Sequence, residues 1–228
     1  MIKTHSIELK NISLDLNGNK IFDKFHLNFP KRGITVILGP NGSGKTMLLN
    51  IIAGLIQPKN GNVVFHDLEF RDFSFVAQNI TLLRRNVFEN ISFPLAVKKE
   101  NKDLIKKKVD ILLSYFKLLD KKSFSARKLS AGNKQLVSIL RAIIEDKKLL
   151  ILDEPFSNID ASVTTKIESL LMRKKSQKKI ILVTHDIFQA KRLADHVVFI
   201  SNGKILSNLG NKSFFSSKNK ILSNYKLG

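Results

Sequence analysis

The sequence predicts an α/β fold with a mostly parallel core sheet, an antiparallel β subdomain at its amino-terminal side and an inserted helical subdomain. Short, fully apolar runs alternate with helical patterns, as in parallel sheets, and occupy residues 34–38, 149–152, 180–183 and 197–200. The opening thirty residues alternate in polarity instead, and residues 87–128 have a helical pattern. A chain of 228 residues can bury such a core. We expect one domain over 1–228, with the helical subdomain inserted at about 87–130.

The first thirty residues predict an antiparallel hairpin. Residues 7–16 and 21–29 each alternate between apolar and polar side chains, as half-buried strands do. Between them, Asn17 and Gly18 form a pair that tolerates the positive φ angles of a tight turn. Further extended segments are expected at residues 60–65, 73–77 and 204–206.

Residues 39–46 carry the pattern G-x-x-x-x-G-K-T between the predicted strand at 34–38 and a predicted helix at 46–53. Glycines there let backbone N–H groups surround phosphate oxygens, and the helix directs its positive end at the same anion. Lys45 is expected to bridge the β- and γ-phosphates, and Thr46 to ligate magnesium. The alternative is a glycine-rich turn that only caps a helix. The predicted phosphate-binding residues are Gly39, Pro40, Asn41, Gly42, Ser43, Gly44, Lys45 and Thr46.

Two acids follow the apolar run at 149–152. Because ligands of open parallel sheets bind at the carboxyl ends of the strands, Asp153 is expected to reach the phosphate site and anchor its metal ion. Glu154 comes one residue later and is placed to orient or deprotonate an attacking water. A strand followed by two acids also occurs by chance. The pair is interpreted as part of a site because the same chain carries the phosphate loop.

One segment resembles the signature of the ATP-binding cassette (ABC) family, usually Leu-Ser-Gly-Gly-Gln; here it reads Leu129-Ser130-Ala131-Gly132-Asn133. The resemblance covers nearly the whole chain and implies a P-loop NTPase fold of the ABC ATPase type that hydrolyses ATP with Mg²⁺. Ser130 and Gly132 open a helix as an anion site. In the family this site binds the γ-phosphate of ATP held by the other subunit, so a second ATP-binding subunit, in a head-to-tail homodimer, is implied.

Three smaller matches complete the site that the resemblance implies. Gln78 follows the predicted strand at 73–77 and is similar to the family's glutamine loop, which touches magnesium and the attacking water. Asp160 resembles the acid of the loop that crosses the dimer interface. His185 ends the predicted strand at 180–183, where the family has a histidine that contacts the γ-phosphate. Such a histidine can donate a hydrogen bond whatever its protonation.

The sequence departs from the family pattern in two regions. Ala131 and Asn133 replace the commonest Gly and Gln of the signature, while its phosphate-facing serine and second glycine remain, so activity is expected to be kept. Near the first hairpin, Leu16 stands where the family often has an aromatic residue that stacks on adenine, so only an apolar contact is expected. Phe22 is an alternative ring, but core packing is the favoured interpretation.

The resemblance implies a motor that works with other subunits. A single cassette without a membrane span implies separate transmembrane permease subunits, docked near Gln78 and residues 79–94. Residues 185–195 resemble importer cassettes, including small-oxyanion types such as tungstate, and imply a solute-binding protein. The start of the sequence lacks the apolar stretch of a signal peptide, and no apolar run reaches bilayer length. We expect a cytoplasmic subunit on the inner face of the cell membrane.

Composition tests these expectations. The chain has no cysteine, which excludes thiolate zinc sites, iron–sulfur clusters and disulfides. Its net charge of +20 favours the alternative of a soluble ABC-type ATPase that acts on nucleic acid or ribosomes. Such proteins usually have two cassettes or a coiled-coil insertion, and the sequence has neither.

The position of the basic residues also bears on that alternative. Twelve basic and four acidic residues lie within 98–134, mostly in the helical part, without the interleaved aromatic residues of a single-strand platform. We therefore expect no nucleic-acid partner. A third class, an ATP-gated structural adaptor, is disfavoured because Glu154 is present.

Overall fold

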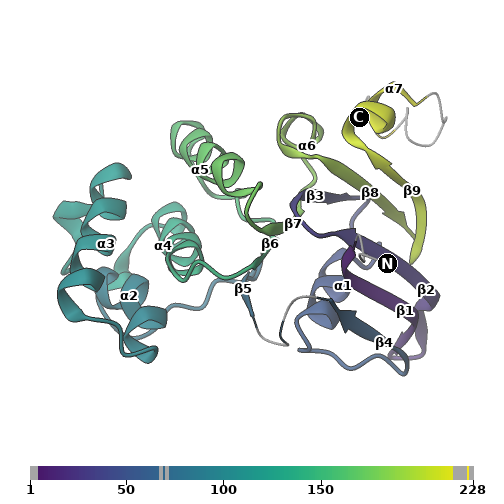
Figure 1. Ribbon diagram of the computed structural model, residues 1–228, viewed down its shortest axis with the longest axis horizontal. Helices are drawn as coiled ribbons and strands as arrows, with labels where there is room; N and C mark the ends of the chain where they lie inside the picture. Colours follow the sequence, from purple (N-terminus) through teal and green to yellow (C-terminus); the bar gives the residue numbers. More distant parts are fainter. Residues whose placement is uncertain (1–4, 67–68, 70–71, 218–224, 226–228) are drawn as a thin grey trace.

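The computed structural model describes residues 5–66, 69, 72–217 and 225, and within them the chain forms two sheets (Figure 1). The larger sheet pairs all its neighbouring strands in parallel except the last two, β8 and β9. Its six strands, in spatial order, are β5 (Phe73–Val76), β6 (Leu149–Asp153), β7 (Lys179–Val183), β3 (Gly33–Leu38), β8 (His196–Ser201) and β9 (Lys204–Gly210). The predicted, mostly parallel core sheet is confirmed.

The smaller sheet is antiparallel, in the order β2 (Asn19–Pro30), β1 (His5–Leu16) and β4 (Asn60–Phe65). The predicted hairpin turn is present, because Asn17 and Gly18 both have positive φ, at 49° and 79°. Between the two sheets lies α1 (Lys45–Ile52), whose leucines and isoleucines join one apolar core with side chains of both sheets. This shared core fixes the start of α1 relative to β3.

A helical region lies at the end of the molecule opposite β1, β2 and β4 (Figure 1). The stretch predicted as helical contains α2 (Val87–Val97) and α3 (Lys102–Tyr115), followed by two 3₁₀ turns, η1 (Leu119–Lys121) and η2 (Ala126–Lys128). The side chains of Asn86 and Asn101 accept hydrogen bonds from the first turns of α2 and α3, which is why separate helices begin there. α4 (Ala131–Ile144) packs this region against the core sheet.

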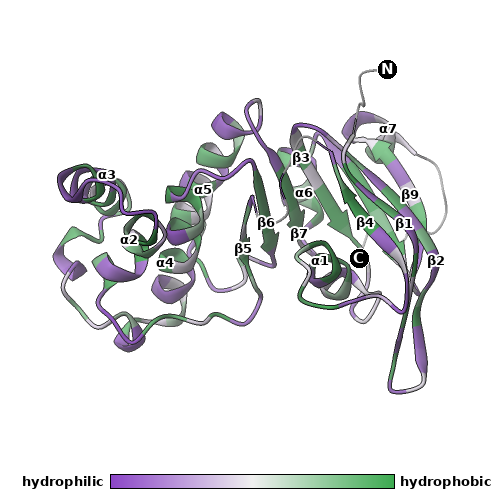
Figure 2. Cartoon of the chain, turned by 60° about the horizontal axis from the view of Figure 1, so that its bottom comes forward, coloured by the Kyte–Doolittle hydropathy of each residue, from purple (hydrophilic) through white to green (hydrophobic). Residues whose placement is uncertain are grey.

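In the described part of the chain, three further helices follow β6. They are α5 (Ala161–Lys174), α6 (Ile187–Leu193) and α7 (Asn211–Ser216), and their buried side chains extend the core that α4 forms on one face of the large sheet. Figure 2 shows the resulting pattern, in which the inner strands β6 and β7 are hydrophobic and helices such as α3 carry hydrophilic outer faces. In the part of the chain that the structure describes, no helix has the length and apolarity to cross a bilayer.

The parallel strands give the large sheet two distinct edges. Their carboxyl ends lead into residue 39 after β3, residue 154 after β6 and residue 184 after β7. Their amino ends are preceded by residues 31–32, 147–148 and 177–178. Ligands of such sheets bind at the carboxyl edge, and the predicted site residues lie there.

Candidate functional site

The loop between β3 and α1 depends on its glycines. Gly39 has φ 151°, and a Cβ atom there would lie 2.0 Å from the carbonyl oxygen of Ile200. Gly44 has φ 99°, and a Cβ atom there would lie 2.9 Å from the ring of Phe22. The loop therefore runs close against β8 and β2, and leads directly into the N-terminus of α1 at Lys45. This is the concave backbone expected of a phosphate site.

Lys45 is anchored to the same loop. Its Nζ donates hydrogen bonds of 2.8 Å each to the carbonyl oxygens of Gly39 and Pro40. Burial lowers the pKa of this ammonium group, and the charges of Glu154 and Asp153 partly oppose that effect. Lys45 also lines the cavity described next, where an anion would pair with its positive charge.

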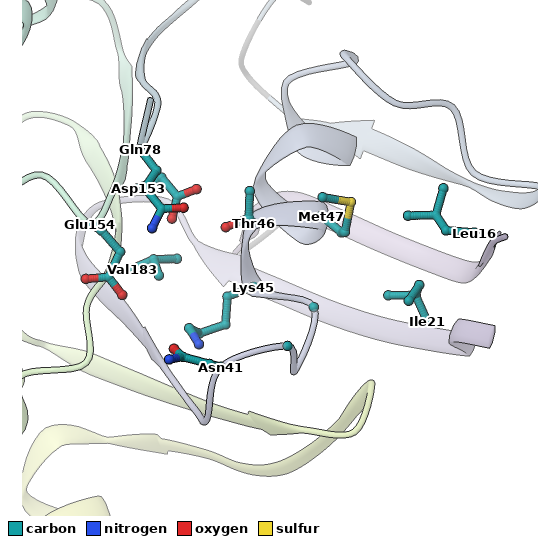
Figure 3. Close-up of a pocket in the computed structure, with 12 residues that line it drawn as sticks. Leu16, Ile21, Asn41, Lys45, Thr46, Met47, Gln78, Asp153, Glu154 and Val183 are labelled. Carbon is teal, nitrogen blue, oxygen red and sulfur yellow. The ribbon is translucent and has the colours of Figure 1, made fainter. Parts of the chain in front are cut away.

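The cavity beside the loop, here called the phosphate-loop cavity, has a volume of about 470 Å³ (Figure 3). One part is polar and contains Lys45, Thr46, Gln78 and the two acids after β6, whereas the far part is apolar and aliphatic. The lining residues are Leu16, Ile21, Asn41, Gly42, Gly44, Lys45, Thr46, Met47, Gln78, Asp153, Glu154 and Val183. The cavity has room for a nucleotide whose phosphates face the loop and whose base faces the aliphatic part.

Asp153 has the properties of a metal ligand. It is 1% exposed, and in the part of the chain that the structure describes neither carboxylate oxygen has a hydrogen bond of good distance and angle. Burial and the charge of Glu154 raise the pKa of Asp153, and the nearby Thr46 hydroxyl and the charge of Lys45 partly oppose that rise. Thr46 and Gln78 line the same part of the cavity as this carboxylate (Figure 3). Carboxylate, hydroxyl and amide oxygens are the ligands that Mg²⁺ prefers, so these residues fit that ion.

Glu154 and His185 meet although 31 residues separate them. The Nδ1 atom of His185 lies 2.9 Å from Oε2 of Glu154. Glu154 has φ 47°, a conformation rare for a residue with a side chain, and its N–H donates to the carbonyl oxygen of Val183. The carboxylate is mostly buried and the ring mostly exposed. A strained backbone therefore holds a carboxylate at the rim of the cavity, against an imidazole.

The remaining predicted residues lie outside the phosphate-loop cavity. Ser130 caps α4, where its hydroxyl accepts a hydrogen bond from the N–H of Asn133 at 3.4 Å. Gly132 fits closely under the next loop, since a Cβ atom would lie 2.4 Å from the carbonyl oxygen of Asn158. Asp160 stands at the start of α5. The structure thus places Ser130, Gly132 and Asp160 on a surface separate from the chain's own cavity.

The structure adds residues that the sequence patterns did not single out. Ile21 and Met47 join Leu16 in the aliphatic part of the cavity, whereas Phe22 is 1% exposed and packs at 4.8 Å from the ring of Phe25. The expected core role of Phe22 is thus confirmed. Tyr225, distant in sequence, donates its hydroxyl to the Gly39 carbonyl at 3.3 Å. A tyrosine in a tail rich in serine, lysine and asparagine gives no sequence signal of such a contact.

Comparisons with known proteins agree with this geometry. The family model described as ABC transporter matches residues 22–157. The chain belongs to the ABC transporter family. Over 205 residues it is 36% identical to the tungstate uptake system ATP-binding protein of Peptoclostridium acidaminophilum, covering 87% of this chain and 96% of that protein.

A second relative is longer than this chain. The spermidine/putrescine import ATP-binding protein of Borrelia garinii subsp. bavariensis is 38% identical over 212 residues, which cover 88% of this chain and 61% of that protein. This ABC chain therefore spans about three fifths of that relative.

Among solved structures, the dimer of an ATP-binding cassette bound to ADP and Pi, in a post-hydrolysis state, superposes with a TM-score of 0.80 at 25% identity, covering 90% of this chain and 98% of that one. The predicted ABC ATPase fold is confirmed. The relatives are ATP-binding subunits of import systems, which confirms the interpretation of an ATPase subunit of an ABC importer and disfavours the nucleic-acid alternative.

Proposed function

We propose that this chain, as a single domain, binds ATP with Mg²⁺ in the phosphate-loop cavity and hydrolyses it to drive import through separate permease subunits. One observation carries the proposal. Lys45, the Asp153–Glu154 pair and His185 come from separate chain segments and meet around one cavity. They supply a cation for phosphate, a buried acid for the metal ion, and a carboxylate that can accept a proton.

Binding is proposed to use the loop amides and the start of α1 for the phosphates. Lys45 leaves the carbonyl oxygens of Gly39 and Pro40 to bridge the β- and γ-phosphates. Thr46, Asp153 and Gln78 would hold Mg²⁺, which supplies neutralisation of the phosphate charge when bound. The base packs in the aliphatic part of the cavity lined by Leu16, Ile21 and Met47, without a stacking ring.

Hydrolysis requires a water in line with the bond from the γ-phosphorus to the leaving oxygen. Glu154 accepts the water's proton as the new P–O bond forms and the old one breaks. The 2.9 Å contact with Nδ1 of His185 fixes the direction of the carboxylate. When Nδ1 donates to Glu154, the ring donates to the γ-phosphate through Nε2 only as an imidazolium. Catalysis is then mainly positioning and charge stabilisation.

A second copy of the chain is proposed to complete each site. Ser130, Gly132 and Asp160 carry no contact to their own cavity, yet Ser130 and Gly132 present a hydroxyl and helix N–H groups at the start of the 14-residue α4. The dimeric structure of the related cassette bound to ADP and Pi supports a pair of copies, which we propose to be arranged head to tail. In such a pair these residues face the γ-phosphate in the partner's cavity.

Permease subunits are proposed to dock in a groove between β5, α2 and α4. The groove has a volume of about 530 Å³ and is lined largely by apolar side chains, among them Phe73, Phe93 and Val97. Val97 is 65% exposed and lines the groove together with Phe73 and Phe93, so its exposed side chain is part of a contiguous apolar surface. The groove includes part of the 79–94 segment expected to make this contact. Docking there places the subunit at the inner face of the membrane.

The transported substrate is proposed to be a small oxyanion such as tungstate, delivered by a solute-binding protein. The tungstate relative supports this proposal, because the match covers 96% of that protein. The polyamine relative matches over only 61% of its own length. Tungstate uptake by cells that carry or lack this chain, with spermidine uptake as the parallel measurement, separates the two substrate classes.

Purification from native membranes tests the partner assignment. We expect hydrophobic multi-span subunits to remain bound after nuclease treatment, and Val97→Asp to release them. The matched control is Leu55→Asp, since Leu55 is also 65% exposed but lies outside the groove. Recovery of RNA without membrane subunits, or equal release by both variants, contradicts the proposed docking.

A further inference from the structure

A further cavity lies at the amino edge of the large sheet. It has a volume of about 280 Å³ and is here called the basic pocket. Its lining combines residues that directly precede β3, β6 and β7 with the first strand and the residue after β4. The seven lining residues are Ser6, Lys31, Arg32, His66, Lys148, Gln177 and Lys178. The phosphate loop follows the other end of β3, so the two cavities are separated by that strand, about 20 Å long.

Basic side chains predominate in the lining of this pocket. Four of its side chains are Lys or Arg, and the others are an imidazole, a hydroxyl and an amide. No carboxylate belongs to the lining among the residues that the structure describes. Without an anion, so many cations in one concave site repel one another. The lining therefore carries an excess of positive charge, although acids outside it pair with Lys178, Lys148 and His66.

Part of the pocket is rigid and built from buried polar groups. Ser6 is 3% exposed, and its hydroxyl donates to the carbonyl oxygen of Pro30. Lys178 is 7% exposed, and its Nζ donates to Asp146 at 2.7 Å and to the Lys147 carbonyl at 2.9 Å. His66 is 8% exposed. Buried polar side chains of this kind distinguish the pocket from a group of surface lysines.

Two acids outside the lining pair with residues of the pocket and with neighbouring lysines. Asp146 pairs with Lys174 as well as Lys178, and the two ammonium groups bring the pKa of Asp146 to about 2. Glu8 pairs with Lys10 and with His66. These carboxylates orient the walls of the pocket.

Two exposed cations belong to the lining of the pocket. Arg32 is exposed and makes no hydrogen bond or ion pair within the described part of the chain. Lys148 is 67% exposed, and its nearest acid is Asp72 at 4.0 Å, the limit of an ion pair. Both side chains can turn toward a ligand without losing a strong contact. A guanidinium group in particular matches two phosphate oxygens at once.

We propose that the basic pocket binds a small phosphate-bearing anion, with Arg32 and Lys148 closing over it and Lys178 and His66 forming its floor. The volume is well below that of the phosphate-loop cavity, which favours a phosphate or pyrophosphate group over a whole nucleotide. Among the described residues the lining contains no Phe, Tyr or Trp, and the His66 ring is only 8% exposed, so bases of a nucleic acid have no open ring on which to stack. The anion is a soluble phosphorylated compound or a lipid headgroup, which share this chemistry.

Titration calorimetry with pyrophosphate tests the proposal in the full chain carrying Lys45→Ala, which removes the competing phosphate site. We expect one binding event to remain. Adding Arg32→Gln and Lys148→Gln should weaken it about tenfold or more, because two charge-assisted contacts are lost. Both side chains are exposed, so the variants should fold; thermal unfolding without ligand checks this.

The matched control is Lys106→Gln with Lys107→Gln, which removes the same charge from exposed positions of α3. It should change pyrophosphate affinity less than twofold. Absence of binding in the Lys45→Ala chain, or equal weakening by both pairs, overturns the proposal.

Sedimentation with vesicles identifies the source of the anion. If phosphatidylglycerol vesicles, but not phosphatidylcholine vesicles, bind the chain through Arg32 and Lys148, the ligand is a lipid headgroup. If pyrophosphate binds and the vesicles do not, the ligand is soluble. Both results support a phosphate site in the basic pocket.

Discussion

The two cavities at opposite ends of β3 obtain their positive potential from different chemical groups. The phosphate-loop cavity has one lysine and two acids, and its positive potential comes mainly from backbone N–H groups and the start of α1. The basic pocket has four cationic side chains and an imidazole, and no acid in its described lining. Both face solvent at an edge of the same sheet.

This difference follows from what each cavity has to do. A hydrolytic site must hold a metal ion and a base, so it needs carboxylates, and a surplus of cationic side chains would neutralise them. Glycine-rich backbone supplies positive potential without that conflict. A site that only binds an anion has no such constraint. The comparison predicts that the two cavities can be disabled separately.

Lys45→Ala should have the largest effect among the separating variants. Removing a group that stabilises charge in the transition state lowers kcat by about 10²–10³-fold. Pyrophosphate binding at the basic pocket should be unchanged. Steady-state ATPase assays and calorimetry measure the two effects side by side. Loss of both in one variant would mean that the cavities are a single coupled site.

His185→Ala should lower kcat less, by about 10- to 100-fold, the contribution of one hydrogen bond to a charged group. Glu154 would keep its place on the backbone but lose its fixed direction. His196→Ala is the control, since its ring contacts Asn208 on β9, outside the phosphate-loop cavity. A kcat that is unchanged in His185→Ala would remove the histidine from the mechanism.

Lys179 makes the amino edge of the sheet sensitive to pH. Burial lowers the pKa of this ammonium group to about 7 from its ordinary value of 10.5. Between these values the unfolded chain binds more protons, so the free energy of unfolding should rise with pH, by up to about 1.4 kcal/mol per unit. Urea unfolding at pH 7 and pH 9 measures this rise. In Lys179→Met this rise of the free energy of unfolding with pH should be smaller. An equal rise in the two proteins would contradict the role assigned to Lys179.

Tyr225→Phe should have the smallest effect. The change removes only the hydroxyl that donates to the Gly39 carbonyl, which becomes more important once Lys45 turns to the phosphates. KM for ATP should rise about two- to fivefold, with kcat nearly constant. Tyr115→Phe on α3 is the matched control. A fall in kcat without a change in KM would contradict this role.

Sequence reasoning succeeds where function depends on neighbours in the chain. The pattern at 39–46 predicts the loop because its glycines are required by contacts under 3 Å at Gly39 and Gly44. Alternating apolar runs predict the parallel sheet, and the sheet's carboxyl edge brings Glu154 to His185.

It fails where single residues from distant segments meet. The basic pocket draws one or two residues from each of several segments, and none of them forms a pattern. The aliphatic part of the phosphate-loop cavity likewise combines Ile21 with Met47. The division of the helical stretch into α2 and α3 depends on the caps at Asn86 and Asn101. The spacing of apolar residues does not predict such caps.

Glu154→Gln tests the central claim most directly, because it removes the proposed base while keeping the shape of the side chain. ATP binding, measured by calorimetry, should remain within about threefold, while single-turnover hydrolysis with Mg²⁺ should fall by about 10²–10⁴-fold. An ATP-bound dimer should then accumulate on gel filtration. Hydrolysis at the original rate would contradict the assignment of Glu154 and of the phosphate-loop cavity as the hydrolytic site.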